Sequence, residues 1–281
     1  MTTTDETTAN AAQIEFWNAG AGDTWASLQD RMDAQLEPLG QKATAALAPR
    51  PGERILDIGC GSGQTSLALA QAVASGGSVL GVDISRPMLE VARRRGGPNG
   101  PDFLEADAQT YAFEPASFDG AFSRFGVMFF ADPVAAFSNI RRALKPGGRL
   151  AFVCWRRPDE NPFMTLPMAA ALSLLPPPPP NDPLAPGPFA FADPARVRDI
   201  LSQAGFGAIE TAPHDRKIGS GDLEQTLGVA LRVGPLGAML REHPERRDRV
   251  IDTVREALRP HEGEDGVKLP SASWIVTARS A

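Results

Sequence analysis

The segment ILDIGCGSGQT, residues 55–65, holds the residues of this chain best suited to chemistry. Gly59, Gly61 and Gly63 occupy alternate positions, and Asp57 stands two residues before the first of them. Glycine adopts backbone conformations that other residues avoid, and it lets a main chain approach a neighbour closely. An acid followed by such a loop, at the end of an apolar run, therefore indicates a site that holds a polar ligand against the backbone.

Two well-known glycine-rich loops do not fit this spacing. A P-loop ends in Gly-Lys followed by Ser or Thr, and no lysine follows these glycines. A dinucleotide site needs its third glycine one position later, where this chain has Gln64. A second acid, Asp83, ends the next apolar run, and an acid there can accept both ribose hydroxyls of a nucleoside. The pattern thus favours a nucleoside ligand without a pyrophosphate.

Strands and helices are predicted to alternate through the middle of the chain. Such alternation is typical of a parallel sheet with helices on both faces. Predicted strands cover residues 54–58, 78–82, 102–105, 118–123 and 149–155, and predicted helices cover residues 64–74, 85–96 and 132–144. The acids and glycines above then fall at the carboxyl ends of strands, where open α/β sheets bind their ligands.

The flanking regions are less regular. Apolar spacing predicts helix over residues 13–47, and residues 1–10 are expected to be disordered. After residue 155 we predict an extended proline run at 176–180, a helix at 193–203, strands at 208–212 and 273–277, and helix over 222–260 with breaks near Pro235 and Pro244.

Composition excludes several classes of protein. The net charge of −6 argues against a nucleic-acid binder, which would more often be basic. Two cysteines and three histidines in no ligand spacing predict neither a disulfide scaffold nor a metal site. The polar, acidic start is unlike a secretory signal, and no run of about 18 apolar residues is present. We expect a cytoplasmic protein without stable membrane insertion.

The ordered series of segments resembles one family. ILDIGCGSGQT, VLGVDIS, FLEADAQTYAF, SFDGAFSRFGVMFF and LKPGGRLAFVCW are similar to the successive motifs of class I S-adenosylmethionine-dependent methyltransferases, above all the ubiquinone/menaquinone-pathway (methyltransferase type 11) group. The resemblance implies a Rossmann-like α/β fold with a seven-stranded sheet of order 3-2-1-4-5-7-6, the last strand antiparallel. It also implies one domain with N-terminal lid helices at 1–48, a cofactor-binding core at 49–155, and the rest of the sheet with substrate-cap insertions at 156–281.

The same resemblance implies roles for particular residues. The methionine end of the cofactor would lie near Asp57 and the loop glycines Gly59, Gly61 and Gly63, with Ser123 or Arg124 beside it. Asp83 would hold the ribose hydroxyls. The adenine would be contacted by Ile84, Met88, Asp107 and Ala108, the last through its backbone amide. Two alternatives stay open: Met88 could be an ordinary core residue, and Asp107 could cap a turn.

The acceptor side is predicted from residues at the same sheet edge. Trp17 and Trp25 are candidates for a lid, and Phe125, Met128 and Trp155 for an apolar pocket. Arg124 and Arg156, after the fourth and fifth strands, could hold an anionic acceptor or the cofactor's carboxylate. His214, expected to follow the sixth strand, is the best candidate for a general base.

These features together predict an enzyme that transfers a methyl group from S-adenosylmethionine to the O, N or C nucleophile of a small molecule, without a metal. Transfer would be an in-line displacement that depends mainly on proximity and orientation. Enzymes of this class that methylate nucleic-acid amino groups carry Asn/Asp-Pro-Pro-aromatic after the fourth strand. This chain has Ser123-Arg124-Phe125-Gly126 there, which argues against such substrates. The main alternative is a non-catalytic module that binds the cofactor or acts as a scaffold, and we expect a monomer or homodimer.

Overall fold

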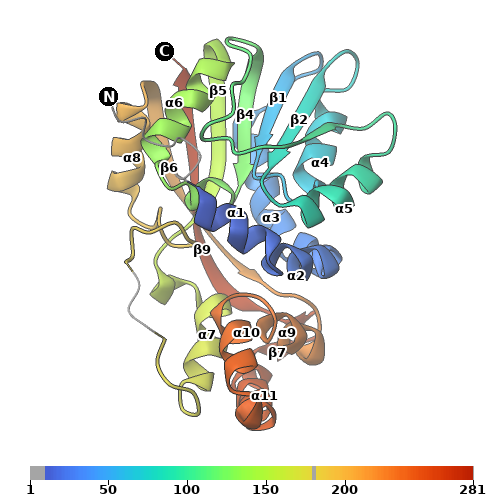
Figure 1. The fold of residues 1–281 in the computed structure, drawn as a ribbon, viewed down its shortest axis with the longest axis vertical. Coiled ribbons are helices and arrows are strands. Elements are labelled where there is room, and N and C mark those ends of the chain that lie inside the picture. The colour runs from blue at the N-terminus through green and yellow to red at the C-terminus, as the bar shows by residue number, and fades with distance from the viewer. Residues whose placement is uncertain (1–9, 179–181, 281) are drawn as a thin grey trace.

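The computed structural model describes residues 10–178 and 182–280. Its main element is a seven-stranded sheet of order β3-β2-β1-β4-β5-β9-β6 (Figure 1). Only β9 runs antiparallel to its neighbours, which confirms the predicted Rossmann-like arrangement. The strands are β1 (Arg54–Ile58), β2 (Ser78–Asp83), β3 (Asp102–Glu105), β4 (Phe118–Arg124), β5 (Leu144–Trp155), β6 (Phe206–Ile218) and β9 (Leu269–Ser280).

Helices cover both faces of this sheet, as the alternating pattern predicted. α3 (Gln29–Leu47), α4 (Gln64–Ala72) and α5 (Arg86–Gly96) lie on one face, and α6 (Pro133–Ala143) and α8 (Pro194–Gln203) on the other. Local sequence defines where they begin. Asp132 caps α6 by accepting a hydrogen bond from the Ala135 amide at 2.9 Å, and Pro133 fills the first helical position. The largest fully buried side chains between the layers are Phe118, Phe122, Phe137, Phe152 and Phe191.

The N-terminal region differs from its prediction. The helix expected over residues 13–47 is three helices, α1 (Ala11–Asn18), α2 (Ala21–Ser27) and α3. Gly20 separates the first two with a φ of +105°, a conformation that glycine reaches most readily. Residues 1–9 of the segment expected to be disordered lie outside the described residues, and Asn10 is buried. α1 and α2 lie across the carboxyl edge of the parallel strands (Figure 1).

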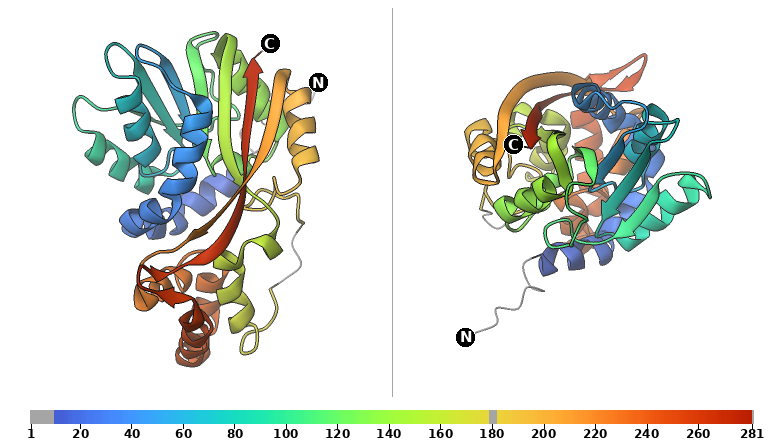
Figure 2. Two further views of the ribbon diagram at one scale, coloured as in Figure 1. Left: turned by 180° about the vertical axis from the view of Figure 1, so that it is seen from behind. Right: turned by 90° about the horizontal axis from the view of Figure 1, so that it is seen from above.

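The last two strands of the sheet are much longer than predicted. β6 and β9 pair from Phe206 opposite Ser280 to Ile218 opposite Leu269, whereas strands were predicted only at 208–212 and 273–277. Seen from behind, the two strands curve out of the sheet and reach a separate group of helices (Figure 2). The alternating apolar pattern fades in this outer part, where β6 is mostly exposed, and this explains the short prediction.

We call the separate group the cap. It contains α7 (Pro162–Ala171), α9 (Leu223–Ala230), α10 (Pro235–Glu242), α11 (Arg247–Leu258) and the hairpin of β7 (Glu262–Gly263) and β8 (Gly266–Val267). The predicted helix breaks near Pro235 and Pro244 are confirmed. The cap has a hydrophobic core of its own, formed by Ala171, Leu175, Leu223, Leu227, Leu231, Leu236, Met239, Leu240, Val250, Val254, Leu258, Val267 and Leu269.

Asn161 joins the cap to the sheet. Its side chain is fully buried where the chain leaves β5 for α7. The Nδ2 group donates to the carbonyls of Ala272 at 3.1 Å and Arg157 at 3.0 Å, and Oδ1 accepts from the Ala272 amide at 2.9 Å. One carboxamide therefore satisfies the backbone of both β9 and the β5–α7 connection.

We predict that Asn161→Ala destabilises the protein by about 2 kcal/mol or more, because it leaves buried backbone groups without partners. Chemical denaturation of the variant and of wild type measures the difference. Asn99→Ala, at an exposed loop position, is the matched control and should change stability by less than about 0.5 kcal/mol. Equal stabilities of the two variants would contradict the junction role.

Candidate active site

The three loop glycines are required by contacts inside the protein. Gly59, Gly61 and Gly63 have φ values of +64°, +54° and +83°, a region that favours glycine. A Cβ on Gly59 would lie 2.7 Å from the Cα of Gly126, in the loop after β4. A Cβ on Gly63 would lie 2.9 Å from the Cβ of Ala92 on α5. The loop is therefore pressed between the β4 end and α5, with its amides close to the sheet edge.

Asp57 lies beneath this loop and is fully buried. Its Oδ2 accepts hydrogen bonds from the hydroxyls of Thr65 at 2.7 Å and Ser66 at 2.6 Å. Its Oδ1 has no hydrogen-bond partner among the described residues. Burial raises the pKa of the carboxyl to about 6, against the opposing effect of the two hydroxyls and of Arg124. A buried acceptor without a partner fits a cationic donor such as the amino group of the expected cofactor.

Asp83 and the glycine loop are directly connected. The Asp83 carboxylate accepts the Gly61 amide on Oδ2 and the Ser85 amide on Oδ1, each at 2.8 Å. Burial raises the pKa of Asp83, and these two amides oppose that effect. The structure thus brings the second predicted acid to the same edge of the sheet as the first.

The residues predicted to contact adenine lie nearby. Asp107 Oδ1 accepts the Gln109 amide at 2.9 Å, so this oxygen does cap a turn, as the alternative interpretation held. Ala108 is buried next to it. Met88 lies against the loop, since a Cβ on Gly61 would be 2.7 Å from the Met88 Cε. Ile84 follows Asp83 directly and is half-buried.

Ser123 and Arg124 are both committed to partners within the protein. The Ser123 hydroxyl donates to the Ile58 carbonyl at 2.7 Å and accepts from the Gly126 amide at 3.1 Å, which holds β4 against β1. The Arg124 side chain pairs with Asp33 of α3 at 3.3 Å and hydrogen-bonds Gln64, at the start of α4. Arg124 therefore links α3 to the end of the glycine loop.

Aromatic side chains gather where β4 and β5 end. Phe125 stacks on Trp155 with ring centroids 3.9 Å apart, and Trp155 lies 4.8 Å from Phe163 of α7. Phe125 has a φ of +62°, which is strained for a residue that is not glycine. The Met128 sulfur accepts the Trp155 amide at 3.5 Å. These side chains form an apolar wall between the sheet edge and the cap.

The predicted lid tryptophans join this wall from the other side. Trp17 on α1 packs edge-on against Trp25 on α2 at 5.9 Å and against Phe129 at 5.4 Å. Phe129 belongs to the short 3₁₀ turn Val127–Phe129 that follows β4. The lid therefore packs against the turn that follows β4, directly after Phe125 and Gly126 in the sequence.

Arg156 is neutralised by nearby acids. It forms ion pairs with Glu160 and with Asp215, the latter at 3.0 Å, and its guanidinium lies 4.8 Å from the Trp274 ring centroid. Arg156 thus connects β5, β6 and β9 through its charge, which is a structural role. The sequence pattern alone did not distinguish this role from ligand binding.

The prediction that His214 follows the sixth strand is wrong, because β6 continues to Ile218. His214 lies level with Trp155, since both residues pair with Ser273 of β9. It is three strands from β4, or about 14 Å at the usual strand spacing. Burial lowers its pKa, and Lys42 and Arg216 add to the effect. The structure does not bring His214 next to Asp57 or Asp83.

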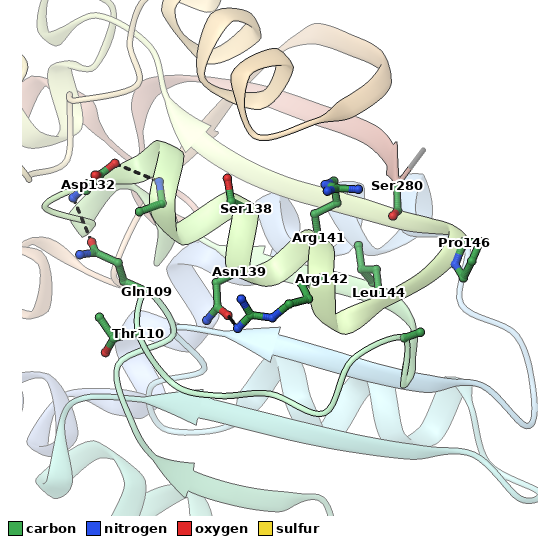
Figure 3. A pocket seen from close by; sticks show the side chains of 12 residues that line it. Gln109, Thr110, Asp132, Ser138, Asn139, Arg141, Arg142, Leu144, Pro146 and Ser280 are labelled. Atoms are coloured by element: carbon green, nitrogen blue, oxygen red, sulfur yellow. Dashed lines mark hydrogen bonds between the residues drawn. The ribbon is translucent and has the colours of Figure 1, made fainter. Parts of the chain in front are cut away.

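A groove on the described surface lies elsewhere. It has a volume of about 920 Å³ and runs beside α6, where Gln109 accepts the Asp132 amide and Arg142 hydrogen-bonds Asn139 (Figure 3). None of the residues predicted for the cofactor lines it. Within the described ranges, no three His, Cys, Asp or Glu side chains cluster as metal ligands, and no helix there is long and apolar enough to cross a bilayer.

Sequence reasoning missed several residues at the site. Thr65 and Ser66 could have been found as hydroxyls in the first turn of the helix that follows the acid. Gly126, which contacts Gly59, and Asp33, which pairs with Arg124, carry no local signal because their partners are distant in sequence. Asn10 and Asn18 belong to the same group, and their contacts are described below.

We predict that Gly59→Ala destabilises the protein by more than about 3 kcal/mol, because a methyl group would meet the Gly126 backbone in addition to the conformational cost. Gly147→Ala is the matched control. Gly147 has a φ of +73° but open space around a Cβ, so only about 1 kcal/mol should be lost. Thermal or chemical unfolding measures both, and equal losses would argue against the backbone contact.

The family model and the similar proteins of known sequence all indicate a methyltransferase. Residues 56–152 match the family model described as "Methyltransferase domain". A demethylmenaquinone methyltransferase from Clavibacter sepedonicus is 44% identical over 108 residues, 38% of this chain and 43% of that protein. The O-methyltransferase cnsE from Penicillium expansum is 31% identical over 221 residues, 77% of this chain and 74% of that protein. The match spans about half the length of the first curated relatives.

Solved structures share the fold. A methyltransferase from Bacillus halodurans, described as putative in its title, superposes with a TM-score of 0.56 at 20% identity, covering 86% of this chain and 98% of the other. Sheet order, the acid-tipped glycine loop and a relative matched over most of both chains agree, and the chain therefore belongs to the class I S-adenosylmethionine-dependent methyltransferases.

Proposed function

We propose that the protein transfers a methyl group from S-adenosylmethionine to a small, apolar, ring-bearing acceptor. The observation that carries the cofactor half of the proposal is the buried Oδ1 of Asp57, an acceptor without a partner beneath the glycine loop. Asp83 supports it, because its carboxylate lies at the end of the neighbouring strand and holds the same loop through the Gly61 amide. Together they present two acids to an amino group and a ribose.

The aromatic cluster supports the choice of acceptor. Phe125 and Trp155 form a buried aromatic stack where β4 and β5 end, with Phe163 of α7 against Trp155, and Trp17 packs on Phe129 in the turn after β4. Flat rings pack well against such surfaces. One relative is named as acting on demethylmenaquinone, a compound of the ring-bearing class.

The two arginines at this edge argue against an anionic acceptor. Arg156 is paired with Glu160 and Asp215, and Arg124 shares Asp33 with Arg95, so both guanidinium groups already have carboxylate partners. An acceptor that approaches the β4 end meets apolar surface and neutralised side chains.

The mechanism assigns this chain mainly the work of alignment. Bound S-adenosylmethionine supplies a methyl group already activated on a sulfonium. Asp57 and Asp83 would hold the two ends of the donor, and the aromatic residues would orient the acceptor ring and exclude water. Proximity and orientation of this kind lower the activation free energy of methyl transfer by several kcal/mol. An enolate or phenolate acceptor attacks directly, whereas an enol or phenol must give up its proton to a base or to water, and the role of His214 as that general base stays a prediction.

A non-catalytic module is the competing proposal. It would keep the fold and bind the cofactor without transferring the methyl group. The intact aromatic wall beside the cofactor edge favours the enzyme, since a scaffold has no use for an apolar surface at that place.

Calorimetry with S-adenosylhomocysteine tests the cofactor half of the proposal. Wild type should bind, and Asp83→Ala should lose at least about tenfold in affinity while its far-UV circular dichroism stays unchanged, because the ribose contact and the loop contact disappear. Transfer of labelled methyl groups to a panel of naphthoquinols, phenols and amines then tests the acceptor. Binding of S-adenosylhomocysteine without methyl transfer to any member of the panel would favour the non-catalytic module. If S-adenosylhomocysteine does not bind, both the enzyme and the non-catalytic module are ruled out.

We predict that Asp57→Asn separates stability from binding. The folded pKa of about 6 lies above the ordinary 3.8, so the charged carboxylate costs the ligand-free fold roughly 3 kcal/mol above pH 6, and this cost falls as the pH drops towards 4. The neutral variant should therefore unfold at an equal or higher temperature. Its affinity for S-adenosylhomocysteine should fall at least about tenfold at pH 7.5, because a charged hydrogen bond is lost.

The pH dependence checks the same point. In wild type the affinity should fall as the pH drops below about 6, where Asp57 takes up a proton, and in Asp57→Asn this dependence should be absent. Asp132→Asn is the control, because Asn is an equally good helix cap and the residue lies outside the site. A variant that is both less stable and unchanged in affinity would show that Asp57 serves only the fold.

A further inference from the structure

The N-terminal helix α1 is fastened at both ends by asparagines. At its start, Asn10 Nδ2 donates to Asp107 Oδ1 at 3.1 Å, and Asn10 Oδ1 accepts the Ala131 amide at 3.2 Å. At its end, Asn18 Nδ2 donates to the Ile84 carbonyl at 2.9 Å, and Asn18 Oδ1 accepts the Arg86 amide at 3.0 Å. Both asparagines thus bind the segments predicted to contact the adenosine part of the cofactor.

The apolar contacts of α1 include those of Trp17 with Trp25 and Phe129, but most of its other side chains are exposed. None of the residues of α1 is fully buried, and Phe16 is 54% exposed. Asn10, by contrast, is only 6% exposed. The helix lies across the strand ends (Figure 1), and the hydrogen bonds of the two asparagines attach both of its ends there.

The contact from Asn10 decides how the Asp107 carboxylate is oriented. Asp107 Oδ1 accepts two hydrogen bonds, from the Gln109 amide and from Asn10. No hydrogen bond from a described residue reaches Oδ2. Two donors on one oxygen fix the rotation of the carboxylate and leave the other oxygen as its free acceptor. A free carboxylate oxygen at this position suits an amino group on the edge of a purine.

A second group on α1 also lacks a partner. Gln13 follows Asn10 by three residues, so helical spacing places the two on the same side of α1, together with Trp17. The Gln13 Oε1 is buried and has no hydrogen-bond partner among the described residues. This acceptor lies on the side of the helix that carries Asn10, so the same side of α1 presents a second polar group near Asp107.

We propose that Asn10 is a positioning residue for base recognition: by holding Asp107 Oδ1 it directs Oδ2 to the amino group of adenine, so that α1 completes the adenosine site. The inference rests on the proposed function, because it needs the cofactor to bind at this edge. It assigns to the N-terminal helix a part in choosing the base, in addition to covering the site.

The test compares two ligands that differ at one group. S-adenosylhomocysteine carries the amino group, and S-inosylhomocysteine carries a carbonyl in its place. Dissociation constants of both are measured by calorimetry on the full chain for wild type, Asn10→Ala and the matched variant Asn18→Ala, which releases the other end of α1 without touching Asp107. Wild type should prefer the adenosine ligand by about tenfold or more.

The expected result is that Asn10→Ala reduces this preference at least about threefold, whereas Asn18→Ala weakens both ligands equally and keeps the preference. A third variant, Asn10→Asp, sets a second carboxylate against Asp107 and should reduce the preference further. If Asn10→Ala and Asn10→Asp both keep the wild-type preference, the inference is wrong while the proposed function stands. If wild type binds neither ligand, the proposed function fails and the inference with it.

Discussion

The contact between two stretches of bare main chain, at Gly59 and Gly126, is the constraint on which the site depends. It brings the ends of β1 and β4 together more closely than any side chain would allow. The Ser123 hydroxyl maintains this approach by bridging the Ile58 carbonyl and the Gly126 amide. Because the two strand ends meet, Asp57 is buried beneath the loop with Oδ2 hydrogen-bonded and Oδ1 without a partner among the described residues. Close packing and an unpaired charge thus arise from the same arrangement.

The sequence was informative wherever residues near one another in the chain determine the structure. Strand β1, the glycine loop and the start of α4 follow from an apolar run, positive-φ glycines and helix-starting residues in one short segment. The sheet order was predicted from the resemblance of the ordered segments to a known family, and the structure confirms this order. The helix caps at Asp132 and Asp193 were also readable, since a cap depends only on residues two or three positions away.

What could not be predicted depends on pairs that are distant in sequence. The lid was expected to be helical without a stated break, because the apolar spacing continues through Gly20, and this residue takes a left-handed conformation that separates α1 from α2. The partner of Arg156 at Glu160 is close in the chain, but Asp33 and Asp215 reach the two arginines only through the fold. His214 was placed past a strand that in fact continues, because the exposed outer part of β6 lacks alternation.

The cap, which packs around its own core and joins the sheet through one pair of strands and Asn161, makes the protein modular. The core of the cap is a cluster separate from that of the sheet, and the two meet at Phe163 of α7. Selection can therefore reshape the acceptor side without disturbing the donor side. In such an architecture, relatives can diversify their chemistry by remodelling the appendage, consistent with a family match confined to residues 56–152.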